Sequence, residues 1–288
     1  MGEIRKGIIF DGKARVAIID IKDLVNEEIK IHDLSPLAAA ALGRSMCCGV
    51  YLSNNLKNST STFSMTINGD GPLGSICVAG NGGNEIRGSI SNPHVELPLK
   101  ENGHLDVGKA VGRTGSITVI KDMGLKEPYV GRTNLVTGEI AEDFAQYLYT
   151  SEGIRSAVSL GVKVDKTGCI AAGGIIIEAL PDLGENETFM LEDIMTNFVN
   201  VSDLFMTKTT HDIFDFYFSH LNAEEYSPEN VTIKCACSKE KVENTLKSLG
   251  KNELYNILRE KNEIEVFCHF CEKKYRYGKE EVDKFWEK

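Results

Sequence analysis

The sequence lacks any long hydrophobic run. No apolar stretch among its 288 residues approaches the roughly 18 residues that a membrane-spanning helix needs. The start, MGEIRKGIIFDGKARV, has no apolar core of a signal peptide, and Lys6 stands where N-myristoylation requires Ser or Thr. We therefore expect a cytoplasmic protein with no membrane partner, in a compartment where stable disulfides are rare.

The sequence also lacks the residue groupings that mark enzymes. Its six histidines are scattered and form neither an HxxxH motif nor an arrangement typical of Ser/His/Asp catalysis. The segment Asn81-Gly82-Gly83 resembles a phosphate-binding loop, but a β-like segment follows it, which favours a hairpin turn. No Rossmann or P-loop motif is supported. We therefore expect a protein that is not an enzyme and has no catalytic residues.

Positive charge is in short supply over most of the chain. The net charge is −10, yet the residues after Val231 hold 13 Lys and Arg against 11 Asp and Glu, so this end is +2 and the remainder is −12. An acidic body repels a phosphate backbone, which disfavours general nucleic-acid binding. Local contact between RNA and the C-terminal end stays open as an alternative.

Cysteine, in contrast, is concentrated near the C-terminus. Four of the eight cysteines form two tight pairs, Cys235-Ala-Cys237 and Cys268-His-Phe-Cys271. Four thiolates are a soft, tetrahedral ligand set that suits Zn²⁺. In a reducing compartment this pattern predicts a metal site or a reversible redox switch. His269, which lies between two of the ligands, is a weaker candidate for the same metal.

The other four cysteines have different surroundings. Cys47, Cys48, Cys77 and Cys169 lie among Ala, Gly, Val and Ile, with no basic or histidine neighbour. Free cysteine is often a small buried hydrophobic residue, so we predict that these four pack in the core.

The first 180 or so residues predict an α+β fold. A helix should begin at Pro36 with Ser35 as its N-cap, and a second should run from Glu139 to Leu148. Strands and helices neither alternate strictly nor separate cleanly. The predicted strands are Ile8–Phe10, Val16–Ile19, Thr62–Ile67, Ser75–Ala79, Glu85–Ile90, Ser116–Ile120 and Gly173–Ile177.

Residues 183–230 combine acidic groups with many large apolar side chains, in a spacing that suits short amphipathic helices. They could be a helical layer packed permanently on the body. They could also be a cover whose Met- and Phe-rich underside becomes a binding surface when it detaches. Composition does not decide between these interpretations.

The last 60 or so residues predict a small separate unit. Its core is too small for secure stability, so a bound metal could supply much of its folding energy. The predicted elements are helices over Lys239–Leu249 and Glu253–Arg259, strands over Ile264–Phe267 and Tyr275–Tyr277, and a helix over Glu280–Trp286.

Taken together, these motifs resemble those of the heat-shock protein 33 family, redox-regulated holdase chaperones that need no ATP. The resemblance covers essentially the full length, and its most specific parts are CACS and CHFC with the strand of Tyr275 after them. Supporting stretches are NGDGPLGSI (68–76), EIRGSISNP (85–93), ITVIKDMG (117–124), EPYVGRTNL (127–135), GEIAEDFAQYLYTSEGI (138–154) and AAGGIIIEALP (171–181).

The resemblance implies an organisation and a mechanism. Residues 1–180 would be an α+β chaperone core, 181–231 a helical metastable linker and 232–288 a zinc-binding redox-switch domain. Reduced Cys235, Cys237, Cys268 and Cys271 would hold Zn²⁺ and keep the protein inactive. An oxidant would pair Cys235 with Cys237 and Cys268 with Cys271 and release the zinc. The active form would be a homodimer that binds unfolded client proteins and passes them to ATP-dependent refolding chaperones.

Two rival functions remain at this point. A zinc-ribbon protein that binds nucleic acid or the ribosome would act in its reduced, metal-bound state, with affinity that falls steeply as salt rises. A thiol-disulfide oxidoreductase would use CHFC as its active site, but Cys268 follows a β-like run and not a helix N-terminus that would lower its pKa.

Overall fold

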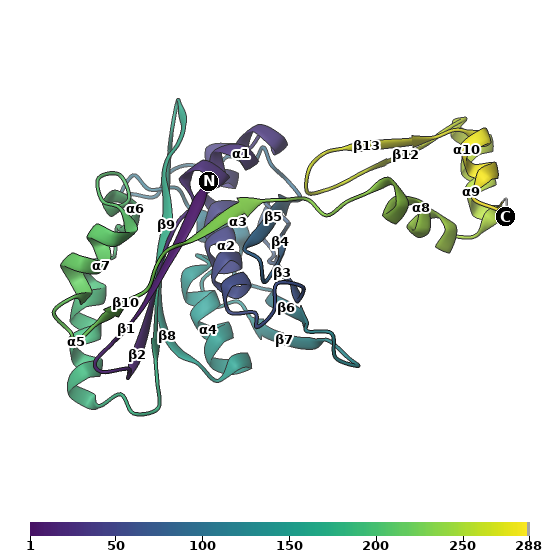
Figure 1. Ribbon diagram of the computed structural model, residues 1–288. Coiled ribbons are helices and arrows are strands. Elements are labelled where there is room, and N and C mark those ends of the chain that lie inside the picture. The colour runs from purple at the N-terminus through teal and green to yellow at the C-terminus, as the bar shows by residue number, and fades with distance from the viewer. Residues whose placement is uncertain (287–288) are drawn as a thin grey trace. The chain divides into compact units, whose positions relative to one another are not determined.

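The computed structural model describes residues 1–286 and divides into two compact units, Met1–Lys234 and a second that begins at Cys235 (Figure 1). Each unit has its own hydrophobic cluster. The predicted α+β class is confirmed. Across residues 1–286, no helix has both the length and the apolarity that crossing a bilayer requires.

One large sheet organises the first unit. Within the described residues its strand order is β7-β6-β3-β4-β5-β11-β1-β2-β9-β8, and β10 pairs with β1 outside this path. Neighbours are antiparallel except β11 and β5, which are parallel. The strands are β1 (Gly2–Ile9), β2 (Ala14–Asp20), β3 (Thr62–Asn68), β4 (Ser75–Asn81), β5 (Glu85–Ile90), β6 (Ser116–Asp122), β7 (Tyr129–Asn134), β8 (Arg155–Asp165), β9 (Gly168–Ala179), β10 (Glu224–Glu225) and β11 (Glu229–Ile233).

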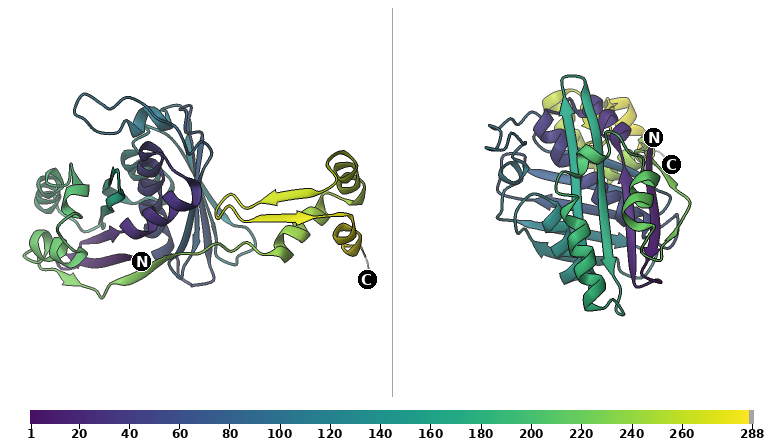
Figure 2. Two further views of the ribbon diagram at one scale, coloured as in Figure 1. Left: turned by 90° about the horizontal axis from the view of Figure 1, so that it is seen from above. Right: turned by 90° about the vertical axis from the view of Figure 1, so that its left-hand side faces the viewer.

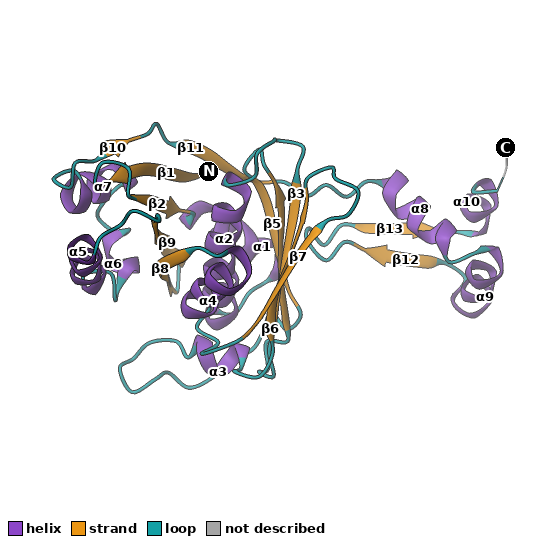
Figure 3. Cartoon of the chain, turned by 90° about the horizontal axis from the view of Figure 1, so that it is seen from below, coloured by secondary structure: helices purple, strands orange, loops and turns teal. Residues whose placement is uncertain are grey.

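Helix α2 (Pro36–Asn54) lies at the centre of this unit. It begins as the sequence predicted, because the Ser35 side chain accepts a hydrogen bond of 3.2 Å from the Ala38 N–H and Pro36 opens the first turn. It contacts β8 and β9 in one half of the sheet and β4 and β5 in the other (Figure 3). The other helices of this unit are α1 (Lys22–His32), α3 (Val107–Val111), α4 (Ala141–Glu152), α5 (Glu185–Thr196), α6 (Val201–Leu204) and α7 (Thr210–Phe218).

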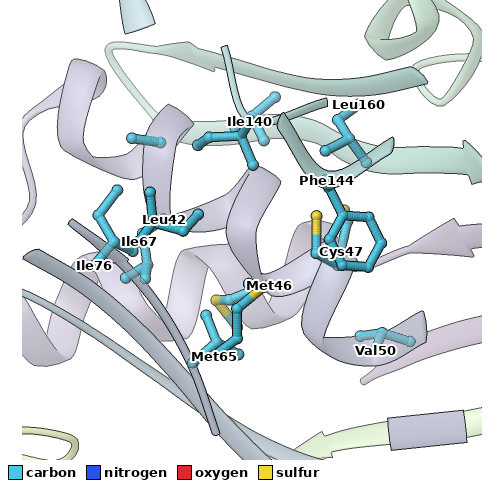
Figure 4. Packing of buried hydrophobic residues seen from close by; sticks show 14 of the residues in the cluster. Leu42, Met46, Cys47, Val50, Met65, Ile67, Ile76, Ile140, Phe144 and Leu160 are labelled. Atoms are coloured by element: carbon cyan, nitrogen blue, oxygen red, sulfur yellow. The ribbon is translucent and has the colours of Figure 1, made fainter. Parts of the chain in front are cut away.

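The core of the first unit is built around α2. Leu42, Met46 and Val50 on this helix pack with residues from both halves of the sheet and with Phe144 of α4 (Figure 4). The backbones approach closely here, since a Cβ at Gly49 would lie 2.4 Å from Val78 Cγ1. Because α2 is in contact on almost every side, its residues are nearly all apolar or small, with little amphipathic pattern.

Helices α5, α6 and α7 cover the opposite face of β1, β2, β8 and β9 (Figure 2). Their cluster includes Phe198, Phe205, Phe214 and Phe218, packed on strand residues such as Ile177. The short helices predicted for this segment are therefore present and packed on the sheet. The segment then continues as strands, which the sequence patterns did not indicate: β10 pairs with β1, and β11 lies between β1 and β5.

The second unit consists of one hairpin and three helices within the described residues. Its elements agree with the predicted ones to within two residues: α8 (Lys239–Ser248), α9 (Lys251–Lys261), β12 (Ile264–Phe267), β13 (Lys274–Tyr277) and α10 (Lys279–Lys284). Its buried cluster is small: Leu246, Leu254, Leu258, Ile264, Tyr275, Tyr277 and Val282. A core of this size supports the fold only weakly.

Replacing Leu42 with Ala should destabilise the first unit by about 3 kcal/mol, because the loss of a buried leucine leaves a cavity. Leu42 is 1% exposed, and its Cδ1 would lie 2.8 Å from a Cβ placed on Gly88 of β5. Urea unfolding followed by circular dichroism measures the change. Leu125→Ala is the matched control, since that side chain is 68% exposed. An equal loss of unfolding free energy in both variants would contradict the central role of α2.

Candidate metal centre

The β12–β13 hairpin positions the second cysteine pair. Cys268 directly follows β12, and its N–H donates a 3.0 Å hydrogen bond to the Lys273 carbonyl across the hairpin. The turn closes through a 2.8 Å bond from the Glu272 N–H to the Cys268 carbonyl, with Glu272 in the left-handed region at φ 54°. This tight turn brings the side chains of Cys268 and Cys271 to one site.

The N-terminus of α8 positions the first pair. Ser238 is its N-cap and accepts a 3.2 Å hydrogen bond from the Lys241 N–H. The Lys241 ammonium also donates to the Ala236 carbonyl at 2.8 Å, which fixes the backbone between Cys235 and Cys237. The first pair is therefore held by a helix start and the second by a hairpin turn.

The four sulfur atoms converge. All four Sγ atoms lie within 4.8 Å of one another. Two of the contacts cross between the motifs: Cys235 to Cys268 and Cys237 to Cys271, both at 3.5 Å. Four sulfurs around one tetrahedral metal at the usual Zn–S distance are about 3.8 Å apart. The arrangement therefore fits a closed, four-coordinate site with sulfur ligands only.

Electrostatics also favour a cation here. Burial raises the pKa of Cys235 and of Cys271. Burial acts in the same direction on Cys237, but hydrogen bonds from Tyr275 and the neighbouring thiols outweigh it and lower its pKa to about 7. One thiol of the group thus ionises readily while others resist. Four thiolates at this spacing require a positive charge among them.

His269 does not join the sulfur cluster. It is exposed, and its ring lies edge-on to Phe267 with 4.7 Å between the ring centroids. Among residues 1–286, the side chains that could hold a metal ion at this site are the four cysteines, and His269 is not one of them.

The remaining cysteines are in the first unit. Cys47, Cys48 and Cys169 are buried in the core as predicted, and burial raises the pKa of each. Cys77 differs, because it is only half-buried and alternates on β4 with the buried Ile76 and Val78. All four therefore have the surroundings of unreactive thiols.

The glycine-rich segment at 81–83 forms a hairpin turn. It connects the antiparallel strands β4 and β5, and Asn84 completes the turn at φ 56°. The Asn81 side chain accepts a 2.9 Å hydrogen bond from the Gly83 N–H, so this donor is already used within the turn. The expectation of a hairpin is confirmed, and no helix follows to receive a phosphate.

A cavity of about 1020 Å³ beside α3 has no evident chemistry of its own. Glu139, a partly buried carboxylate in its lining, is paired with Arg44 at 2.7 Å and with Lys100. Burial raises the pKa of Glu139, but these hydrogen bonds outweigh it and lower the pKa. Glu139 also accepts a 3.1 Å hydrogen bond from the Gly108 N–H of α3, so this carboxylate connects α2, α3 and the loop of Lys100.

Sequence reasoning missed the role of Tyr275 beside the cysteines. It was predicted only as part of a strand, yet its hydroxyl donates a 3.2 Å hydrogen bond to Cys237 Sγ. The alternation of Lys274, Tyr275, Arg276 and Tyr277 does indicate that both tyrosines share one face of the strand. It does not indicate that one of them meets a sulfur atom.

Fold and site together define a class: an α+β body followed by a small unit whose four cysteines could hold a metal ion. The model of the Hsp33 protein family matches residues 3–278. The chain belongs to the Hsp33 family, a family of chaperones.

Curated relatives agree with this assignment. The chain is 43% identical over 264 residues to the 33 kDa chaperonin of Caldanaerobacter subterraneus subsp. tengcongensis, with 91% of this chain and 90% of that protein covered. It is 42% identical over 288 residues to the 33 kDa chaperonin of Clostridium perfringens strain SM101, covering 98% and 90%. The crystal structure of the 33 kDa chaperonin (heat shock protein 33 homolog) from Thermotoga maritima matches with a TM-score of 0.89 at 34% identity, covering 98% of this chain and 97% of that one.

Replacing Cys268 with Ser should weaken metal binding by more than about tenfold, since even changes around the ligands cost that much. The second unit should then become sensitive to protease while still reduced, because its own core is small. Metal content and limited proteolysis measure the two effects. Cys77→Ser is the matched control and should leave both unchanged. A Cys268→Ser protein with a protease-resistant second unit would contradict the prediction.

Proposed function

We propose that this protein is a cytoplasmic, redox-regulated chaperone that holds unfolding proteins without ATP. The observation that carries the proposal is the convergence of four thiol sulfurs in a unit that follows directly after the last strand of the body. Membership of a chaperone family supplies the class of function. The thiol cluster would be the switch, because the same four thiols would bind the metal, react with the oxidant and hold the second unit folded.

Zinc is the proposed metal, and Cys235, Cys237, Cys268 and Cys271 are its proposed ligands. The donor set supports zinc because it is all sulfur and lies at tetrahedral spacing. When bound, the metal neutralises thiolate charge and joins the start of α8 to the β12–β13 turn. The second unit then gains a strong link between these two segments, in addition to the contacts of its few buried side chains.

Oxidation is the proposed signal. Thiolates are the reactive form of cysteine, and hypochlorous acid, or peroxide with heat, converts them through sulfenic acid to disulfides. Following the family resemblance, we propose that Cys235 pairs with Cys237 and Cys268 with Cys271. A disulfide sulfur is a poor metal ligand, so the metal leaves. The second unit then loses the link between the start of α8 and the β12–β13 turn.

The chain around β11 is the proposed route into the body. β11 ends at Ile233, and Cys235 follows two residues later. Before β11, helices α5–α7 shield a cluster rich in phenylalanine that packs on the sheet. If this segment loosens when the second unit unfolds, apolar surface on both sides is exposed, and such surface binds unfolded client proteins.

The proposed partners follow from the same resemblance. The oxidised form would be a homodimer, and reduction would release clients to ATP-dependent refolding chaperones. Nucleic acid is disfavoured as a partner because the chain before Thr232 carries a charge of −12, from a total of −10 and +2 after Val231.

Hypochlorite treatment should release one zinc per chain and reduce the free thiols from eight to four. The treated protein should suppress aggregation of a thermally unfolding client without ATP, whereas the reduced protein should not. Metal release, thiol titration and light scattering measure these steps. His269→Ala is the matched control and should switch like the unmodified protein, because its ring lies outside the sulfur cluster.

Two results would count against this function. Zinc retained through complete oxidant treatment would indicate a structural ribbon and favour nucleic-acid binding. Equal suppression of aggregation by the reduced protein would remove the switch, although a chaperone would remain.

A further inference from the structure

The four sulfurs of the metal centre do not have equal surroundings. The Tyr275 hydroxyl donates to Cys237 Sγ at 3.2 Å. Within residues 1–286, no other side-chain hydroxyl makes such a bond to any of the four sulfurs. Cys268, the first cysteine of the other pair, has no counterpart of this hydroxyl. The two halves of the centre therefore differ in one specific interaction.

The fold holds Tyr275 firmly in this position. Its side chain is 7% exposed, and its register opposite Val266 is fixed by the β12–β13 hairpin. The Lys273 ammonium lies 5.3 Å from the centroid of the tyrosine ring. A cation over the ring draws electron density from the phenol, which makes the hydroxyl a better hydrogen-bond donor. The paired strand and the burial of the ring thus fix the position of the hydroxyl, and the nearby ammonium strengthens it as a donor.

A hydrogen bond to a thiolate has a predictable chemical effect. It withdraws electron density from the sulfur, and the nucleophilicity of a sulfur falls as that density falls. The bond is strongest while the sulfur carries its full negative charge and weakens as the charge moves to the oxidant in the transition state. In the zinc-loaded protein all four sulfurs are already thiolates, so the hydrogen bond does not add to the thiolate fraction there. In that state Cys237 should therefore attack an oxidant more slowly than it would without Tyr275.

We propose that Tyr275 is a positioning residue that slows the oxidation of Cys237 in the zinc-bound state and so sets how readily this cysteine responds to oxidant. This inference rests on the proposed redox function and adds a residue that sets its sensitivity. Tyr275 neither binds the metal nor exchanges electrons. It acts through the sulfur atom that it contacts.

The step that Tyr275 slows is the attack of Cys237 on a peroxide. The sulfur forms a bond to the nearer oxygen, the O–O bond breaks and hydroxide leaves, which gives a sulfenic acid. A second thiolate, that of Cys235 in the proposed pairing, then attacks the oxidised sulfur, forms the S–S bond and displaces a second hydroxide. Two thiolates have together given two electrons to one hydrogen peroxide.

The test compares Tyr275→Phe with Tyr277→Phe in the zinc-loaded full-length protein. Tyr277 lies on the same face of β13 and is buried, but its hydroxyl is directed to the Lys239 carbonyl at 3.5 Å. Tyr275→Phe should increase the rate of Cys237 oxidation by hydrogen peroxide about three- to tenfold, because about half of a charge-assisted hydrogen bond is lost in the transition state. The rate at Cys268 should not change. Differential alkylation and mass spectrometry give the rate at each cysteine.

Two further measurements separate an electronic role from a structural one. In the cobalt-substituted protein, Tyr275→Phe should shift the sulfur-to-cobalt charge-transfer band, whereas Tyr277→Phe should not. Replacing Tyr275 with 3-fluorotyrosine keeps the ring and strengthens the donor, so Cys237 should then oxidise more slowly than in the unmodified protein. This variant also tests the proposal if Tyr275→Phe does not retain zinc.

Unchanged Cys237 oxidation in both Tyr275 variants would overturn the proposal, as would equal acceleration at Cys237 and Cys268. Equal acceleration by Tyr277→Phe would show a general loosening of the unit and would also overturn it. The unmodified protein separates this failure from failure of the proposed function: if it loses zinc and thiols on oxidation, the switch stands without Tyr275. If it keeps both, the redox function itself fails.

Discussion

Four thiol groups within 4.8 Å of one another cannot all ionise without a cation among them. This constraint governs the second unit, because its own hydrophobic cluster is small and adds only a few contacts between α8 and the hairpin besides those at the sulfurs. With a metal, the start of α8 and the turn after β12 are joined at one point. Without a metal, the remaining free energy of folding comes from a few buried side chains and a two-stranded hairpin. Under the proposed function, chemistry at the sulfur atoms would therefore act directly on whether the unit is folded.

The first unit is not equally stable throughout. Its weakly held part is β11, which directly precedes the second unit in sequence. Helix α2 is enclosed on almost all sides, whereas β11 contributes one fully buried side chain, Val231, and one partly buried one, Ile233, to the core. Its other side-chain contacts are polar. Asn84 Nδ2 donates to Glu229 at 3.1 Å, and Lys234 pairs with Glu85 at 2.5 Å. Exposed ion pairs of this kind contribute little free energy. A strand in the middle of a sheet but held mainly by its backbone bonds can separate locally without unfolding the α2 core.

The sequence was informative where structure depends on neighbours along the chain. Ser35 and Pro36 defined the start of α2, and the two cysteine pairs defined the site, because caps and tight turns are local. It was uninformative where an element depends on pairing in space. β11 is a short polar segment, ENVTI, whose strand character comes from the edges of β1 and β5 on either side of it. Cys77 was predicted in the core from its apolar neighbours, although alternation with Ile76 and Val78 already directs it to the other face. The contact between Tyr275 and Cys237 joins residues 38 positions apart, and no spacing rule covers it.

The reduced arrangement also bears on why oxidation and unfolding would be coupled. The sulfur contacts at 3.5 Å cross between the motifs, from Cys235 to Cys268 and from Cys237 to Cys271. The proposed disulfides instead lie within each motif, and an S–S bond is only about 2.05 Å long. Crosslinks between the motifs would keep the start of α8 joined to the β12–β13 turn after the metal had left. Disulfides within the motifs remove that connection, because each one closes a loop of only a few residues. Under the proposed mechanism, the choice of partner would therefore decide whether oxidation preserves the fold or releases it, and the proposed pairing within motifs would release it.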